Sequence, residues 1–178
     1  MRARVLLALA LPALADAYTV WSSDASDIVK WPTMSIANPV AVDIHDAGTT
    51  SPNASNAVNE ILASFAEWES VTGAEVRFDE GAWSDPHFEY GDDSGNSINR
   101  VGFVLDNWPA SASSALAVTA VQGGGPVGAM FIDEADIYIN EHLYDWGDEP
   151  GDPDTLFDIR SVVTHEIAST STKKIKIP

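Results

Sequence analysis

The chain contains no cysteine. It therefore has no disulfides, no thiol chemistry and no cysteine-type zinc site. Basic residues are also scarce, because nine Lys and Arg stand against 27 Asp and Glu and give a net charge of −18. A charge this negative argues against nucleic acid or an anionic membrane as a partner.

Long apolar runs are absent except at the N-terminus. Arg2 and Arg4 precede an apolar run, and Ala15-Asp16-Ala17 has the small-x-small pattern of a cleavage site. The run is too short to span a bilayer, and Pro12 interrupts it. We therefore predict a signal peptide over residues 1–17. The mature protein is expected to be secreted and extracellular, with its start near Tyr18.

The 178 residues suit one domain, and apolar spacing predicts two helices. Residues 55–71 carry one apolar face, with Asn53 or Ser55 as the expected cap and Gly73 as the end. The stretch FDIRSVVTHEI, residues 157–167, carries a second apolar stripe. Asp152, Pro153 and Asp154 are expected to start this helix. The residues that form the first face are Val58, Ile61, Leu62, Phe65, Trp68 and Val71.

Alternation of apolar residues and turn signals predict the strands. Strands are expected near residues 34–36 and 40–44, then over 74–78, 98–105, 116–121 and 129–140. The turn Gly123-Gly124-Gly125-Pro126 makes the last two a hairpin. Residues 107–114 and 141–151 are expected to be loops.

His165 and Glu166 stand near the end of the second predicted helix. They open the zinc-peptidase helix motif, in which two His one turn apart bind the metal and the intervening Glu is the general base. The alternative is that His165 is only a partly buried helix histidine bonded to a backbone carbonyl, next to Glu166 by chance. The position one turn later holds Ser169. The Gly and third His of the longer metzincin pattern are replaced by Thr172 and Ile175.

The stretch FDIRSVVTHEI resembles the active-site helix of the matrixin-like metzincins, which are secreted zinc endopeptidases. The similarity runs from Trp31 to Ile167 and includes the phrase Glu134-Ala135-Asp136-Ile137 of the predicted hairpin. It implies an α+β fold like the metzincin N-terminal subdomain. That fold has a twisted, mostly parallel sheet of about five strands with an antiparallel edge strand, packed on two long helices.

The resemblance also implies a site. His165 would be the first zinc ligand and Glu166 the catalytic base, acting on a protein or peptide substrate. The edge strand that holds substrate would be Ala115, Leu116, Ala117, Val118 and Thr119. One imidazole cannot hold catalytic zinc, and Ser169 is a poor ligand at neutral pH. We therefore expect a monomeric, inactive chain, with His45, His87 and His142 as the histidines that could replace the lost ligands.

The last ten residues differ from the rest of the chain. Lys173, Lys174 and Lys176 are three of the nine basic residues, and every Asp and Glu lies at or before Glu166. We expect residues 18–168 to be an incomplete catalytic domain without its C-terminal subdomain, followed by an aberrant tail over 169–178. A frameshift or gene-end error would explain this tail, and a natural basic end remains the alternative.

Residues 79–99 are rich in Asp, Gly, Ser and Asn. Such a segment could wrap a calcium ion, with Asp92 and Asp93 as the candidate ligands. A solvated acidic loop fits the same composition. The alternative to a peptidase is therefore an acidic secreted module that binds calcium or peptide without catalysis.

Overall fold

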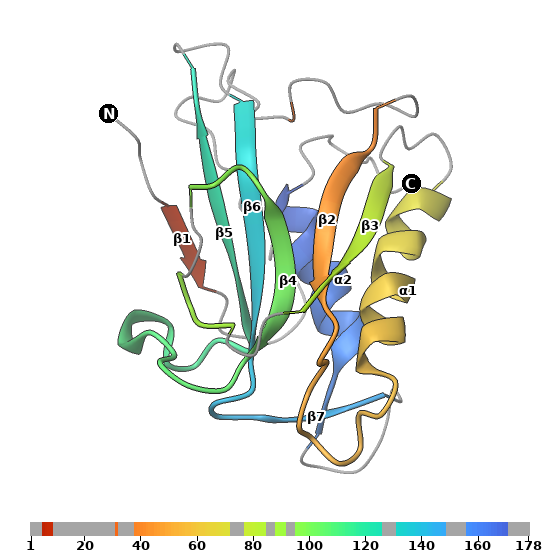
Figure 1. The fold of residues 1–178 in the computed structure, drawn as a ribbon. Coiled ribbons are helices and arrows are strands. Elements are labelled where there is room, and N and C mark those ends of the chain that lie inside the picture. Colours follow the sequence, from red (N-terminus) through yellow and green to blue (C-terminus); the bar gives the residue numbers. More distant parts are fainter. Residues whose placement is uncertain are drawn as a thin grey trace.

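The computed structural model describes residues 5–8, 31, 38–71, 77–84, 88–91, 95–125, 131–148 and 156–170. Its centre is a mixed sheet of five strands in the order β5-β6-β4-β2-β3 (Figure 1). These strands are β2 (Val40–His45), β3 (Phe78–Trp83), β4 (Asn99–Val104), β5 (Ala117–Gly124) and β6 (Phe131–Asn140). The pairings β3·β2, β2·β4 and β4·β6 are parallel, and β6·β5 is antiparallel. The predicted mostly parallel sheet is confirmed, with β5·β6 as the antiparallel pair among these five strands, in an α/β rather than an α+β arrangement.

Three shorter strands complete the described part. β1 (Val5–Ala8) pairs antiparallel with the outer edge of β5, inside the predicted signal peptide. β7 (Asp145–Gly147) and β8 (Leu156–Asp158) form a separate two-stranded parallel sheet. The predicted loop over residues 141–151 is thus wrong at β7. The predicted loop over 107–114 likewise contains a 3-10 turn, η1 (Ala110–Ala112).

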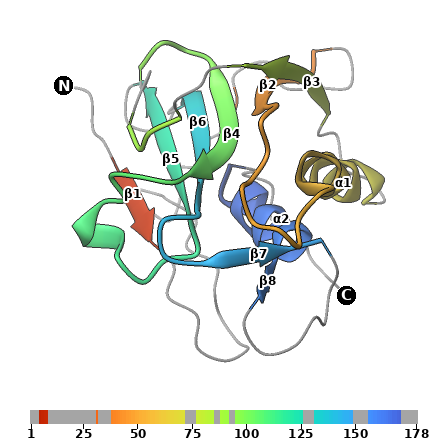
Figure 2. The same cartoon turned by 60° about the horizontal axis from the view of Figure 1, so that its bottom comes forward.

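Both predicted helices are present and lie side by side on one face of the sheet (Figure 2). α1 (Ala57–Ser70) and α2 (Ile159–Thr170) enclose a core with alternate residues of β2, β4 and β6. The Trp68 indole donates to the Thr164 carbonyl at 2.8 Å, and Arg160 Nε lies 2.7 Å from Glu60 Oε2. Within the described residues, no helix has the length and apolar character needed to cross a membrane.

The helix starts differ from the prediction. α2 begins at Ile159, and Asp158 Oδ2 accepts the Ser161 N–H at 2.7 Å, as a capping residue does. Residues 152–154, the expected start, lie outside the described residues. α1 receives no side-chain cap bond from Asn56, its N-cap residue. Asp148, 92 residues later, accepts the Asn56 N–H at 2.9 Å instead of the expected Asn53 or Ser55 cap.

Strand boundaries also shift. β3 runs from Phe78 to Trp83, so it begins where the expected strand over 74–78 ended. It occupies residues assigned to the acidic loop, because an edge strand with exposed side chains tolerates Asp, Glu and Gly. β5 continues through Gly123 and Gly124, which were expected in the turn. A Cβ at Gly123 would lie 2.0 Å from the Phe131 carbonyl oxygen, so only glycine fits this pairing.

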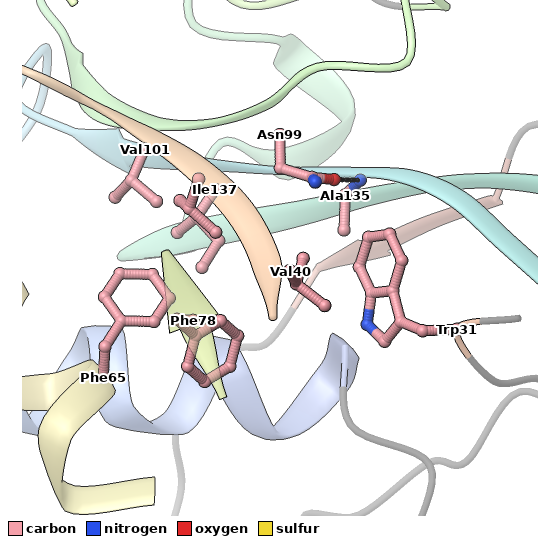
Figure 3. Close-up of a pocket in the computed structure, with 9 residues that line it drawn as sticks. Trp31, Val40, Phe65, Phe78, Asn99, Val101, Ala135 and Ile137 are labelled. Atoms are coloured by element: carbon pink, nitrogen blue, oxygen red, sulfur yellow. Dashed lines mark hydrogen bonds between the residues drawn. The ribbon is translucent and has the colours of Figure 1, made fainter. Parts of the chain in front are cut away.

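A small apolar cavity lies between the sheet and α1 (Figure 3). Its volume is about 10 Å³, roughly enough for one water molecule. The Asn99 side chain on its wall is satisfied, because it donates to the Ala41 carbonyl and accepts the Ala135 N–H, both at 2.8 Å. This cavity is too small for a substrate. The residues that line it are Trp31, Val40, Val42, Phe65, Phe78, Asn99, Val101, Ala135 and Ile137.

Candidate functional site

The apolar stripe of α2 fixes how the His-Glu pair is presented. Ile159, Val163 and Ile167 are fully buried, so this stripe faces the sheet. Glu166 is next to Ile167 in sequence and is itself only 3% exposed. A carboxyl group with this little exposure must find its partners within the protein.

The partner of Glu166 is Thr119 on β5. Thr119 Oγ1 lies 2.5 Å from Glu166 Oε2 and 3.3 Å from the Glu166 carbonyl oxygen. Burial raises the pKa of Glu166 to about 7, although the bonds from Thr119 lower it. A carboxyl with a pKa near neutrality can both accept and release a proton under physiological conditions. Glu166 therefore has the acid–base property expected of a catalytic glutamate.

His165 is half-buried on α2, and burial lowers the pKa of its imidazole. The neutral imidazole is therefore the form present at neutral pH, and this is the form that binds metals. His165 thus meets the protonation requirement for a first ligand.

The other predicted ligands do not join it. His45 is buried at the end of β2 against the rings of Trp83 and Phe88. His142 is exposed, and its Nδ1 lies 2.9 Å from the Leu105 carbonyl oxygen. His87 lies outside the described residues. Across the described ranges, no three His, Cys, Asp or Glu side chains are grouped to hold a metal ion.

The donor set therefore does not fit a catalytic zinc ion. The position one helical turn after His165 is Ser169, within α2. A hydroxyl at neutral pH is a weaker zinc ligand than the imidazole this motif needs. Without further ligands, His165 and Glu166 offer one imidazole and one buried carboxyl group.

The predicted substrate edge falls partly on β5. Ala115 and Leu116 precede the strand, and their carbonyl oxygens accept bonds from Asn140 Nδ2 and the Asn140 N–H, both at 2.9 Å. Val118 and Thr119 pair with Ala8 and Leu7 of β1. The outer edge of β5 therefore already holds an extended segment of this chain.

The sequence did not predict the contact between Thr119 and Glu166. Thr119 was predicted only as an edge residue, because nothing in the sequence links it to Glu166, 47 positions away. The candidate calcium ligands Asp92 and Asp93 lie outside the described residues.

No protein-family model matches the chain, and no curated protein or solved structure is significantly similar to it. The similarity to matrixin-like metzincins therefore rests on the residues quoted above and stays a prediction.

Proposed function

We propose that this chain has the scaffold of a matrixin-like zinc endopeptidase but does not catalyse peptide hydrolysis. The observation that carries the proposal is the pair on α2: a half-buried neutral His165 beside a buried Glu166 whose pKa is raised to about 7. The five-stranded sheet behind α2 supports the same interpretation. Ser169 and Ile175, at the places of the second and third ligands, support the loss of catalysis.

Restoring the missing ligands tests the proposed lineage. The variant Ser169→His/Thr172→Gly/Ile175→His supplies two imidazoles and the glycine that lets the chain turn after the helix. We expect it to retain about one zinc ion per chain after dialysis, while the wild type retains none. The matched control replaces the same two ligand positions by Gln. If the triple variant folds but binds no more zinc than the control, the scaffold assignment is wrong.

The wild-type protein also tests the proposed lack of peptidase activity. Wild-type protein incubated with casein and zinc should release no peptides above background, because one imidazole leaves the metal to solvent. Cleavage that a chelator abolishes would contradict this part of the proposal while leaving the scaffold intact.

A second candidate function is peptide binding without cleavage on the outer edge of β5. It is favoured by β1, since four residues of this chain already pair there in antiparallel register. An incoming strand would use the same backbone groups. Fluorescence anisotropy of labelled extended peptides should show binding to a protein that starts at Tyr18 and therefore lacks β1. The full chain, in which β1 occupies the edge, should bind the same peptides more weakly. Binding should survive Glu166→Ala. Equal binding by both chain lengths would contradict competition with β1.

A further inference from the structure

The face of the sheet opposite the helices carries a second group of buried titratable side chains. Glu134 and Asp136 are two residues apart on β6, so they point to the same face. They are 1% and 3% exposed. The proposed function uses neither of them. Such a pair is costly to bury and calls for a physical role.

Glu134 holds the segment that enters β4. Its Oε1 accepts the Gly95 N–H, and its Oε2 accepts the Ser97 N–H, both at 2.6 Å. Gln122 Nε2 of β5 donates to Oε1 as well, at 3.0 Å. One carboxylate therefore ties residues 95–97 to two strands of the sheet.

The held segment is conformationally strained. Gly95 has φ 91°, and Ser97 has φ 64°. The left-handed conformation is unfavourable for a residue with a Cβ such as Ser97. The bond from the Ser97 N–H to Glu134 offsets this cost, so weakening that bond would let the segment relax.

Asp136 is the neighbour whose charge matters. Its Oδ1 accepts the Arg100 N–H at 2.9 Å, and its Oδ2 lies 3.2 Å from the Tyr138 hydroxyl. Burial is the main reason that the pKa of Asp136 is raised to about 7, and the charge of Glu134 adds to it. The Arg100 guanidinium lies over the Trp83 ring, 4.3 Å from its centroid.

Other groups face this pair from the elements around it. Tyr138 stands beside Asp136 on β6, and the Tyr90 ring lies 4.8 Å from the Tyr138 ring. His45 of β2 stacks on Phe88, which in turn stacks on Tyr138. Gln122 contributes a neutral amide from β5. Arg100 of β4 is the cationic group whose backbone bonds to Asp136, and Asp43 of β2, its register partner on the same face, adds a further carboxylate.

We propose that Glu134 and Asp136 form a proton-controlled latch, in which one shared proton lets Glu134 hold residues 95–97 on the sheet and its loss releases them. With the proton on Asp136, Glu134 is the single negative charge and receives three N–H donors. When both groups are ionised, two like charges occupy one buried site. Entry of water would relieve this repulsion. Residues 95–97 cover Glu134, so they are the segment that would move away from the sheet.

Amide hydrogen exchange measures the release directly. In the wild type, protection of the Gly95 and Ser97 amides, corrected for intrinsic rates, should fall by up to about tenfold per pH unit as the pH rises from the ordinary Asp value of 3.8 to about 7, and should level off above pH 7. Asp136→Asn keeps the shape and removes the charge, so its protection should stay flat over the same range. Protection that does not change with pH in the wild type, or that changes equally in Asp136→Asn, would overturn the latch.

Two further measurements separate release from general unfolding. The Val101 and Phe103 amides of β4 should keep their protection, and a parallel loss there would mean that the whole sheet opens. Glu134→Gln removes the second charge and one strong acceptor. It should lower protection at Gly95 and Ser97 at every pH and abolish the decrease between about pH 4 and pH 7. A persistent decrease in this variant would contradict a shared proton.

Discussion

At the scale of single residues, the surroundings of Glu166 come from β5. The carboxyl group is buried, and the hydroxyl that reaches it belongs to Thr119 on β5. The bonds from Thr119 favour the ionised form, whereas burial favours the protonated form and has the larger effect. The protonation of Glu166 therefore depends on a side chain that comes from a different element.

Replacing Thr119 by Val, which has nearly the same shape, tests this dependence. Loss of the hydroxyl should raise the pKa of Glu166 above the wild-type value of about 7, because the side-chain bond that lowers it is removed while burial and the bond from the Thr119 backbone remain. Thr119→Ser retains the hydroxyl and should stay near the wild type. The titration of the Glu166 side-chain carbon can be followed by NMR. An unchanged pKa in Thr119→Val would show that the hydroxyl has no effect.

These residues could be predicted from the sequence to different degrees. Helical spacing placed His165 and Glu166 on one helix, because the stripe of Ile159, Val163 and Ile167 has a clear period. It could not identify Thr119 as a partner, since pairing across 47 residues depends on the sheet register. Glu134 and Asp136 were visible only as polar residues within an apolar strand.

At the scale of elements, α1 depends on a distant residue for its start. Asp148 Oδ2 accepts the Asn56 N–H at 2.9 Å and lies 3.5 Å from the Ser55 hydroxyl. A carboxylate at a helix N-terminus satisfies an otherwise unpaired N–H and interacts favourably with the helix dipole. The segment that follows β7 therefore stabilises the first helix.

Asp148→Ala should lower the free energy of unfolding by about 1 kcal/mol, as is usual when a side chain that accepts an N–H at a helix N-terminus is lost. The backbone bond from the Asp148 N–H to the Asn53 carbonyl remains in this variant. Asp145→Ala, at an exposed position of β7, is the matched control and should change stability little. Urea unfolding monitored by tryptophan fluorescence measures both. Equal losses in the two variants would argue against the capping role.

Elements differed in how well their residues predicted them. α1 holds five of the six apolar residues at helical spacing, so its position could be predicted within two residues at its start. β7 and β8 have three residues each, too few for a period to appear. β3 was placed too early, because Asp79, Glu80 and Gly81 are typical of a loop until the pairing with β2 is known.

At the scale of the whole molecule, two buried carboxyls and a net charge of −18 both make the folded state less stable as the pH rises. The pKa values of Asp136 and Glu166 are both raised to about 7, above their ordinary values of 3.8 and 4.5. Folding therefore favours their protonated forms. The stability they contribute is complete below the unfolded values and is lost as the pH rises through about 7.

We therefore expect a larger free energy of unfolding at pH 5 than at pH 8. Glu166→Gln, which cannot ionise, should reduce this difference by up to about 3 kcal/mol. Urea unfolding at both pH values, repeated in high salt to screen the general negative charge, separates the buried group from surface repulsion. A wild type that gains stability between pH 5 and pH 8 would contradict the raised pKa values.

The two helices that pack together lie far apart along the chain, and this bears on how the protein folds. Ser64 Oγ donates to the Arg160 carbonyl across 96 residues, and the Arg160–Glu60 ion pair spans 100. Contacts between such distant segments slow folding, because a long loop must close before they form. During synthesis, the apolar face of α1 emerges well before its partner. A chaperone that shields this face until α2 arrives would therefore raise the folded yield.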